Sequence, residues 1–141
     1  MENQPYLSVI IPAYNEAEKI VDHLKKIDTY LREKSFSYEI LVVTDGPKDN
    51  TAEVVEHMKL DIPNLRLIDR KENMGKGYTV KQGILEAKGK IRLFTDADGS
   101  TDISHFDKMR PLFDQGYDVV GGSRYGDLVL AHFDPPTVQT R

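Results

Sequence analysis

Two aspartates one residue apart, Asp96 and Asp98, are the residues whose types and spacing most directly suggest chemistry. They follow the apolar run 91–95, where a buried strand would end and reach solvent. Two carboxylates about 4 Å apart repel by roughly 4 kcal/mol at an effective dielectric constant of about 20, so both stay ionised readily only beside a cation or strong hydrogen-bond donors. Oxygen ligands of this kind suit Mg²⁺ or Mn²⁺, which often complete their coordination with water and substrate phosphates. An ordinary turn at residues 98–100 explains the same pattern, so the rest of the chain must decide.

Five short apolar runs bounded by turn residues predict five strands. They lack polar alternation, which favours strands covered on both faces, as in a parallel sheet. The runs are Leu7 to Ile11, Ile40 to Thr44, Leu65 to Ile68, Ile91 to Thr95 and Val119 to Gly121.

Segments with apolar residues at helical spacing separate these runs and are expected to cover the sheet. Asn15 and Asn50, each three residues before a glutamate, predict that the first two helices begin with a variant of the capping box. The apolar positions are Ile20, Leu24, Ile27 and Leu31, then Val54, Val55 and Met58, then Val80, Ile84 and Ala87, and finally Phe106, Met109 and Phe113. The alternation predicts an α/β fold, a Rossmann-like doubly wound domain with a mainly parallel sheet and helices on both faces.

Length and composition limit the possible classes. A chain of 141 residues is expected to form one domain, 1–141, and its 39% apolar and 30% charged residues are typical of a soluble globular protein. A net charge of −4 argues against nucleic-acid binding driven by overall charge. The chain has no cysteine, and its apolar runs are too short to cross a bilayer, so we expect a cytoplasmic protein without a transmembrane segment.

Polar residues follow each predicted strand, and in a parallel sheet these loops meet at one edge. With the common strand order 3-2-1-4, the ligand crevice lies between the first and fourth strands, so the loop Pro12-Ala13-Tyr14-Asn15-Glu16 faces the two aspartates. Pro12 can end the strand and Asn15 can cap a helix, but neither role explains Tyr14. An aromatic ring beside a helix start can stack on a base, while free backbone N–H groups attract an anion.

Three further residues are candidates for ligand contact, each with a plain structural alternative. Asp45 follows the second strand and either forms a turn or accepts hydrogen bonds from a base or ribose. Lys76, near the start of the third helix, either meets a diphosphate or is simply solvated. Arg124 follows the fifth strand, where it either holds phosphate oxygens or lies on a surface loop. The four histidines have no paired metal spacing, and His23 and His57 are predicted to lie on helix surfaces.

Taken in order, five motifs closely resemble the inverting nucleotide-sugar glycosyltransferases of family 2, with the A-type fold. Within that family the chain looks most like the polyprenyl-phosphate sugar synthases, the dolichyl-phosphate glucosyltransferases and mannosyltransferases, and the match covers residues 7 to about 124. The motifs are Pro-Ala-Tyr-Asn-Glu from residue 12, Thr44-Asp45-Gly46, Gly75-Lys76-Gly77, Asp96-Ala97-Asp98-Gly99 and Gly122-Ser123-Arg124.

The resemblance implies a donor site for a uridine or guanosine diphosphate sugar. The loop 12–16 would line the nucleotide pocket, and Asp45 would meet the base. Asp96, Ala97 and Asp98 would serve the ribose and the metal-bound diphosphate, with Asp98 the better metal ligand. The Mg²⁺ or Mn²⁺ ion and the phosphate-facing side chain of Arg124 would stabilise charge on the leaving diphosphate while an acceptor attacks the anomeric carbon from the opposite face.

Two departures from the family pattern shape the expectations. Thr44-Asp45-Gly46-Pro47 stands where many relatives have two consecutive aspartates, which suggests a different donor preference. The acceptor-binding segments and catalytic base of the family have no recognisable counterpart in residues 125–141, which we expect to be an irregular tail. A polyprenyl phosphate acceptor, and peripheral association with the cytoplasmic face of a membrane, are implied by the resemblance alone.

Two other functions stay open from the sequence. The chain could be a non-catalytic or truncated nucleotide-sugar binding module, since it carries the donor motifs without the acceptor half. The run from Phe94 to Thr101 also resembles the motif of haloacid-dehalogenase-like phosphohydrolases, in which Asp96 would be the nucleophile and Asp98 the acid and base. In that class the motif stands near the start of the domain, whereas here three strand-helix units precede it.

Overall fold

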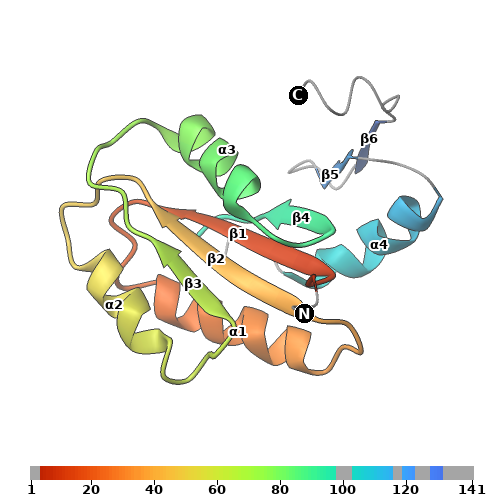
Figure 1. The fold of residues 1–141 in the computed structure, drawn as a ribbon, viewed down its shortest axis with the longest axis horizontal. Helices are drawn as coiled ribbons and strands as arrows, with labels where there is room; N and C mark the ends of the chain where they lie inside the picture. Colours follow the sequence, from red (N-terminus) through yellow and green to blue (C-terminus); the bar gives the residue numbers. More distant parts are fainter. Residues whose placement is uncertain (1–3, 98–102, 116–118, 123–127, 132–141) are drawn as a thin grey trace. The chain divides into compact units, whose positions relative to one another are not determined.

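The computed structural model describes residues 4–97, 103–115, 119–122 and 128–131. The chain has two compact units, residues 1–101 and 102–141. The first unit alternates strands and helices as the sequence predicts (Figure 1). Its elements are β1 (Leu7–Ala13), α1 (Ile20–Arg32), β2 (Tyr38–Thr44), α2 (Thr51–Met58), β3 (Leu65–Ile68), α3 (Lys76–Glu86) and β4 (Ile91–Phe94).

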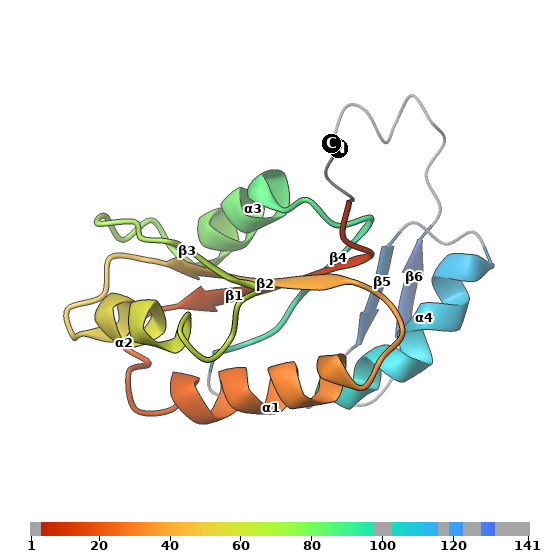
Figure 2. The same ribbon diagram turned by 60° about the horizontal axis from the view of Figure 1, so that its bottom comes forward.

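The four strands of the first unit form one parallel sheet in the order β3-β2-β1-β4. This confirms the predicted strand order and the α/β fold class. Figure 2 shows α1 and α2 on one face of the sheet and α3 on the other, the three-layer arrangement of a doubly wound domain. All four strands therefore end at the same edge, where the polar loops leave the sheet.

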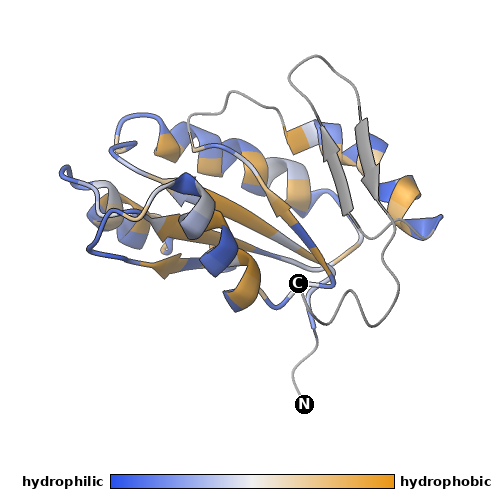
Figure 3. Ribbon diagram, turned by 90° about the horizontal axis from the view of Figure 1, so that it is seen from above, coloured by the Kyte–Doolittle hydropathy of each residue, from blue (hydrophilic) through white to orange (hydrophobic). Residues whose placement is uncertain are grey.

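The two central strands are buried on both faces. In β2, Ile40, Leu41, Val42 and Val43 have no exposed surface, and β1 is equally covered from Leu7 to Ile11. Continuous apolar runs of this kind are what a parallel sheet sandwiched between helices requires. Figure 3 shows the strands mostly in the hydrophobic colour, and the loops at their carboxyl ends in the hydrophilic one.

Helix α1 packs as its periodicity predicts, whereas α3 does not. Ile20, Leu24, Ile27 and Leu31 of α1 are all fully buried. In α3 the residues buried against the sheet are Thr79 and Gly83, followed by Ala87 just after the helix, whereas Ile84, expected to face the sheet, is 37% exposed. Small residues on this face let the helix backbone approach the sheet closely.

The two predicted capping boxes are wrong. Helix α1 begins at Ile20, and its N-cap position makes no side-chain cap hydrogen bond. Asn15 adopts a positive φ of 51° instead and lies in the preceding loop. Helix α2 does begin after Asn50, but the Asn50 side chain makes no cap bond. Asp49 takes that role, since its Oδ1 accepts a hydrogen bond from the Thr51 backbone N–H at 3.0 Å.

Of the two histidine predictions, one is confirmed and the other is wrong. His57 is exposed on α2, as expected. His23, predicted to lie on a helix surface, is only 4% exposed because it shares the buried face of α1 with Leu24 and Ile27.

The second unit contains a 3₁₀ turn (Ile103–His105), α4 (Phe106–Asp114), β5 (Val119–Gly122) and β6 (Leu128–Ala131). The fifth predicted strand is therefore present as β5, but it pairs antiparallel with β6 in a separate two-stranded sheet rather than joining the parallel one. Strand β6 lies within the stretch 125–141 that was expected to be irregular. Among the described residues, no helix combines the length and apolar character needed to span a bilayer.

Candidate nucleotide-sugar site

A cleft of about 370 Å³ opens at the carboxyl ends of the parallel strands. This volume is within the range of about 300 to 1,000 Å³ that is usual for small-molecule sites. Eight of the eleven residues proposed from the sequence line it, together with Thr79, which the sequence analysis did not single out. The lining residues are Pro12, Ala13, Tyr14, Glu16, Asp45, Lys76, Thr79, Asp96 and Ala97.

Tyr14 supplies the exposed aromatic surface of the cleft. It follows β1 directly, and 40% of its surface is accessible. The next residue, Asn15, does not line the cleft. Its Oδ1 accepts hydrogen bonds from the backbone N–H groups of Lys48 at 2.7 Å and Asp49 at 3.3 Å. Asn15 therefore ties the loop after β1 to the loop after β2 and holds Tyr14 in place indirectly.

A second bond secures the same pair of loops. The Glu16 backbone N–H donates to Thr51 Oγ1 at 3.1 Å. Burial works to raise the pKa of Asp49, but hydrogen bonds from the Thr51 hydroxyl, the Thr51 backbone and the Ala17 backbone outweigh it and hold that pKa below its ordinary value. Asp49 is thus ionised at neutral pH and fixes the start of α2.

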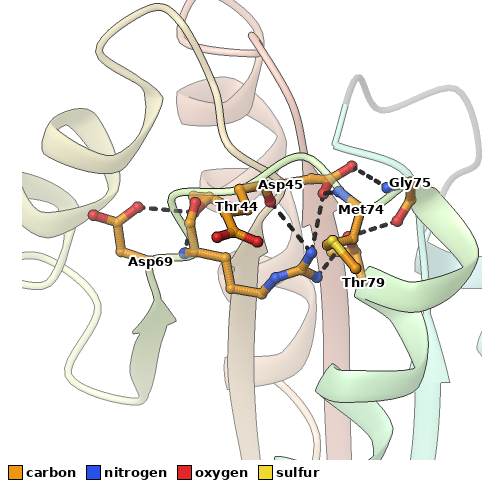
Figure 4. Close-up of polar contacts among 8 residues, drawn as sticks. Thr44, Asp45, Asp69, Met74, Gly75 and Thr79 are labelled. Carbon is orange, nitrogen blue, oxygen red and sulfur yellow. Dashed lines mark hydrogen bonds and ion pairs between the residues drawn. The ribbon is translucent and has the colours of Figure 1, made fainter.

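Asp45 is a buried carboxylate with most of its hydrogen-bonding capacity already engaged. It is 6% exposed. Its Oδ1 accepts from the Met74 backbone N–H at 2.7 Å and its Oδ2 from the Gly75 backbone N–H at 3.1 Å, as Figure 4 shows. Arg70 Nη2 also donates to Oδ1 at 3.2 Å. A carboxylate has about four acceptor positions, so one remains for a donor in the cleft. Asp45 therefore holds the turn at Met74 and Gly75 and also lines the cleft, while its contact with a base or ribose stays a prediction.

Arg70 is the site residue that sequence reasoning missed. It follows β3, and only 11% of its side chain is exposed. Besides Asp45, its guanidinium donates to Thr79 Oγ1 at 2.9 Å and lies 4.8 Å from the centre of the Tyr78 ring. The polar sequence Asp69-Arg70-Lys71 after a strand was the available signal, but it did not distinguish Arg70 from its neighbours.

The turn after Asp45 requires glycine. Gly46 has a φ of +63°, and a Cβ at this position would lie 2.7 Å from the Asn73 backbone nitrogen. Its own N–H donates to the Arg70 carbonyl at 3.0 Å. The loops after β2 and β3 therefore run in backbone contact, which brings Arg70 next to Asp45.

Thr44 links the same two loops from the side of the sheet. Its hydroxyl donates to Asp69 Oδ1 at 2.8 Å and accepts from the Arg70 backbone N–H, also at 2.8 Å. The hydrogen bond from Lys71, assisted by the one from Thr44 and by the charge of Lys71, outweighs burial and lowers the pKa of Asp69. Thr44 thus has structural partners of its own in the loop after β3.

Lys76 and Asp96 form an ion pair across the cleft. Lys76 is the first residue of α3 and Asp96 follows β4, so the pair joins two loops that the sequence predicted to meet. Both side chains are accessible, with 59% of Lys76 and 40% of Asp96 exposed. Asp98 and Arg124, the other two proposed site residues, lie outside the described residues.

The described part of the chain holds no group of three or more histidine, cysteine, aspartate or glutamate residues placed to bind a metal ion. Of the two aspartates in the pair, Asp96 lies among the described residues. Its accessible carboxylate oxygens are ligands of the kind that Mg²⁺ and Mn²⁺ prefer. The chemistry of this side chain therefore fits a hard divalent cation.

Comparison with known proteins identifies the family. The family model described as "Glycosyl transferase family 2" matches residues 8–137. The dolichyl-phosphate beta-glucosyltransferase of Dictyostelium discoideum is 44% identical over 114 residues, which are 76% of this chain and 35% of that protein. The enzyme of the same name from Saccharomyces cerevisiae is 40% identical over 114 residues, 77% of this chain and 34% of that protein. The chain thus spans about a third of the length of these curated relatives.

Solved structures agree with this result. S. aureus TarS 1-349 superposes with a TM-score of 0.64 at 25% identity, over 80% of this chain and 34% of that one. The mannosyltransferase PcManGT from Pyrobaculum calidifontis, solved with GDP-Man and Mn²⁺, gives a TM-score of 0.58 at 31% identity, over 68% of this chain and 28% of that one. These similarities support the glycosyltransferase A-type fold expected from the sequence.

Proposed function

The chain belongs to glycosyl transferase family 2, and we propose that it binds a nucleotide-diphosphate sugar and forms the donor half of an inverting, metal-dependent glycosyltransferase. The observation that carries this proposal is the composition of one cleft. An exposed tyrosine, a buried aspartate and a lysine-aspartate ion pair meet there, at the carboxyl ends of β1, β2 and β4 and the start of α3. This is the crevice in which open α/β sheets bind their ligands.

Each cleft residue has a part in donor binding under this proposal. Tyr14 stacks on the base or ribose, and the remaining acceptor position of Asp45 receives a base N–H. Lys76 and Arg124 contact phosphate oxygens. Because Asp45 is buried and held by three donors, it orients the base without rearranging, which lowers the entropic cost of binding.

A divalent cation, Mg²⁺ or Mn²⁺, belongs to the proposal as its cofactor. Asp96 and Asp98 would hold it, and when bound it would supply positive charge to the leaving diphosphate. Support comes from the aspartate chemistry described above and from the Mn²⁺ in the complex of PcManGT.

The relatives suggest the sugar and the acceptor. Since several are named dolichyl-phosphate beta-glucosyltransferases, we propose glucose as the transferred sugar and a polyprenyl phosphate as the acceptor of the whole protein. The GDP-Man complex of PcManGT keeps GDP as a second candidate nucleotide beside UDP. A location at the cytoplasmic face of a membrane stays a prediction.

Ligand-induced thermal stabilisation tests donor binding directly, because a ligand that binds only the folded state raises the melting temperature. We expect UDP-glucose or GDP-mannose to stabilise the chain with Mn²⁺ present and Asp96→Asn to lose most of this effect. Asp61→Asn is the matched control, because it removes an exposed charge from a residue that does not line the cleft. If neither nucleotide sugar nor its free diphosphate shifts the transition in the wild-type chain, the proposal is wrong.

A binding module without transferase activity is the second candidate, because the roles proposed above for the cleft residues are all roles in donor binding. Transfer of labelled glucose to a short polyprenyl phosphate separates the two, because a module binds the donor and forms no product. The phosphohydrolase alternative is less well supported, since the family model covers the strand-helix units before Asp96 that this alternative leaves without a role.

A further inference from the structure

Two ion pairs involve residues that line the cleft, and they differ in how deeply they are buried. The side chains of Arg70 and Asp45 are 11% and 8% exposed, and each has additional hydrogen-bond partners nearby. Lys76 and Asp96 are 59% and 40% exposed. An exposed ion pair opens at little cost, whereas breaking a buried one leaves an uncompensated charge. The Arg70–Asp45 pair therefore has a structural role, whereas the Lys76–Asp96 pair is able to exchange partners.

The position of Lys76 allows such an exchange. Within the part of the chain that the structure describes, its ammonium bonds to Asp96, and an ammonium has three donors. Gly75, immediately before it, has a φ of +95°, and a Cβ added there would have no heavy atom within 4 Å. The Asp45 carboxylate fixes the backbone N–H of Gly75, so the base of the lysine is anchored while its side chain reaches into the cleft.

We infer that Lys76 takes the place of the metal ion in the ligand-free protein and exchanges partners when the donor binds. This inference rests on the proposed function. In the free protein the ammonium balances the charge of Asp96. When the donor and a divalent cation bind, the Asp96 carboxylate would hold the cation, and the released Lys76 ammonium would pair with a diphosphate oxygen of the nucleotide. No charge is left unpaired in either state, so metal and diphosphate each favour binding of the other.

The inference predicts effects of opposite sign on metal and nucleotide in one variant. In Lys76→Gln the competitor of the metal is gone, so nucleotide-free protein should bind Mn²⁺ about threefold to tenfold more tightly. The same variant should bind UDP, at saturating Mn²⁺, about threefold to tenfold more weakly, because the diphosphate has lost its partner. Free Mn²⁺ measured by electron paramagnetic resonance gives the first affinity, and calorimetry with UDP gives the second.

Lys81→Gln is the matched control, since it removes an exposed positive charge from the same helix outside the cleft. It should change the Mn²⁺ affinity less than twofold, because solvent and salt screen a charge at this distance from the cleft. Adding Asp96→Asn to Lys76→Gln should remove the gain in Mn²⁺ affinity.

The inference fails if Lys76→Gln binds Mn²⁺ no more tightly than Lys81→Gln, or not at all. Weakened UDP binding on its own would make Lys76 a simple phosphate contact. Absence of UDP and GDP binding to the wild-type chain with Mn²⁺ is a separate result, which contradicts the proposed function and not the metal competition.

Discussion

At the scale of single residues, the site depends on a buried arginine that orients a buried carboxylate. The guanidinium of Arg70 donates through two different nitrogens to Asp45 Oδ1 and Thr79 Oγ1, a geometry that its planar fork provides. Charge-assisted bonds of this kind are roughly twice as strong as neutral ones. The carboxylate is therefore fixed before a ligand arrives.

Arg70→Lys tests this orientation while keeping the positive charge. Lysine cannot donate to both partners in the same geometry, so we expect a loss of about 1 to 3 kcal/mol in unfolding free energy and roughly tenfold weaker nucleotide binding. Urea denaturation and calorimetry measure the two effects. Lys71→Ala removes the neighbouring exposed lysine and should cost less than about 1 kcal/mol. Wild-type values for both quantities in Arg70→Lys would show that the charge alone is sufficient.

Sequence alone could place several cleft residues but not their partners. Asp45, Lys76 and Asp96 were identifiable because each stands at a strand end or helix start, and topology brings such positions together. Arg70 stands at a strand end too, but its role depends on a contact with Asp45, 25 residues earlier in the chain. No local pattern encodes that distance.

At the scale of elements, the approach of α3 to the sheet sets the position of Lys76. The helix packs through Thr79 and Gly83, and a Cβ on Gly83 would lie 2.4 Å from Ile10 Cγ2. Ile10 is completely buried, so it has no room to move aside. The close packing of this face is what holds the first turn of α3 against the cleft.

Two glycines of α3 should respond in opposite directions to alanine. Gly83→Ala should destabilise the chain by about 1 to 3 kcal/mol, because overpacking against Ile10 outweighs the gain in helix propensity. Gly77→Ala has nothing within 4 Å of the added Cβ, so it should stabilise by up to about 1 kcal/mol. Thermal and urea unfolding measure both. Destabilisation of equal size in the two variants would mean that backbone conformation, not packing, decides.

The same helix shows where pattern reading reaches its limit. Apolar spacing predicted the buried face of α1 correctly because large side chains fill that interface. In α3 the interface is made by small residues, so the search for apolar residues selected Ile84, which is exposed. The capping boxes failed for a related reason, since Asn15 bonds to the loop at Lys48 rather than to its own helix.

At the scale of the whole molecule, the sequence predicted the parallel sheet and its strand order but not the separate β5-β6 sheet. Repeated strand-helix units restrict the possible arrangements strongly, whereas a short apolar run such as Val119–Gly122 does not specify its partner strand.

The amino ends of the parallel strands carry a further feature that no sequence motif predicted. Glu39 of β2 is 5% exposed there, among groups from the other three strands or their flanks.

Glu39 should make the whole sheet sensitive to acid. Its Oε2 accepts from Ser8 Oγ at 2.6 Å and from the Lys88 backbone N–H at 2.7 Å, and its Oε1 pairs with Arg66 at 2.6 Å. Burial works to raise the pKa of Glu39, but these bonds outweigh it and hold the pKa below its ordinary value.

A depressed folded-state pKa adds stability that is fully present above the unfolded value of about 4.3 and is lost as pH falls through the folded value. Glu39→Gln should therefore unfold about 2 to 4 kcal/mol more easily than wild type at neutral pH, and this difference should shrink as the pH falls below the unfolded value, in urea titrations at each pH. Glu56→Gln, which removes an exposed carboxylate paired with Lys59, should stay within about 1 kcal/mol of wild type throughout. Parallel stability curves for wild type and Glu39→Gln between neutral and acid pH would mean that the charge of Glu39 does not hold the four strands together.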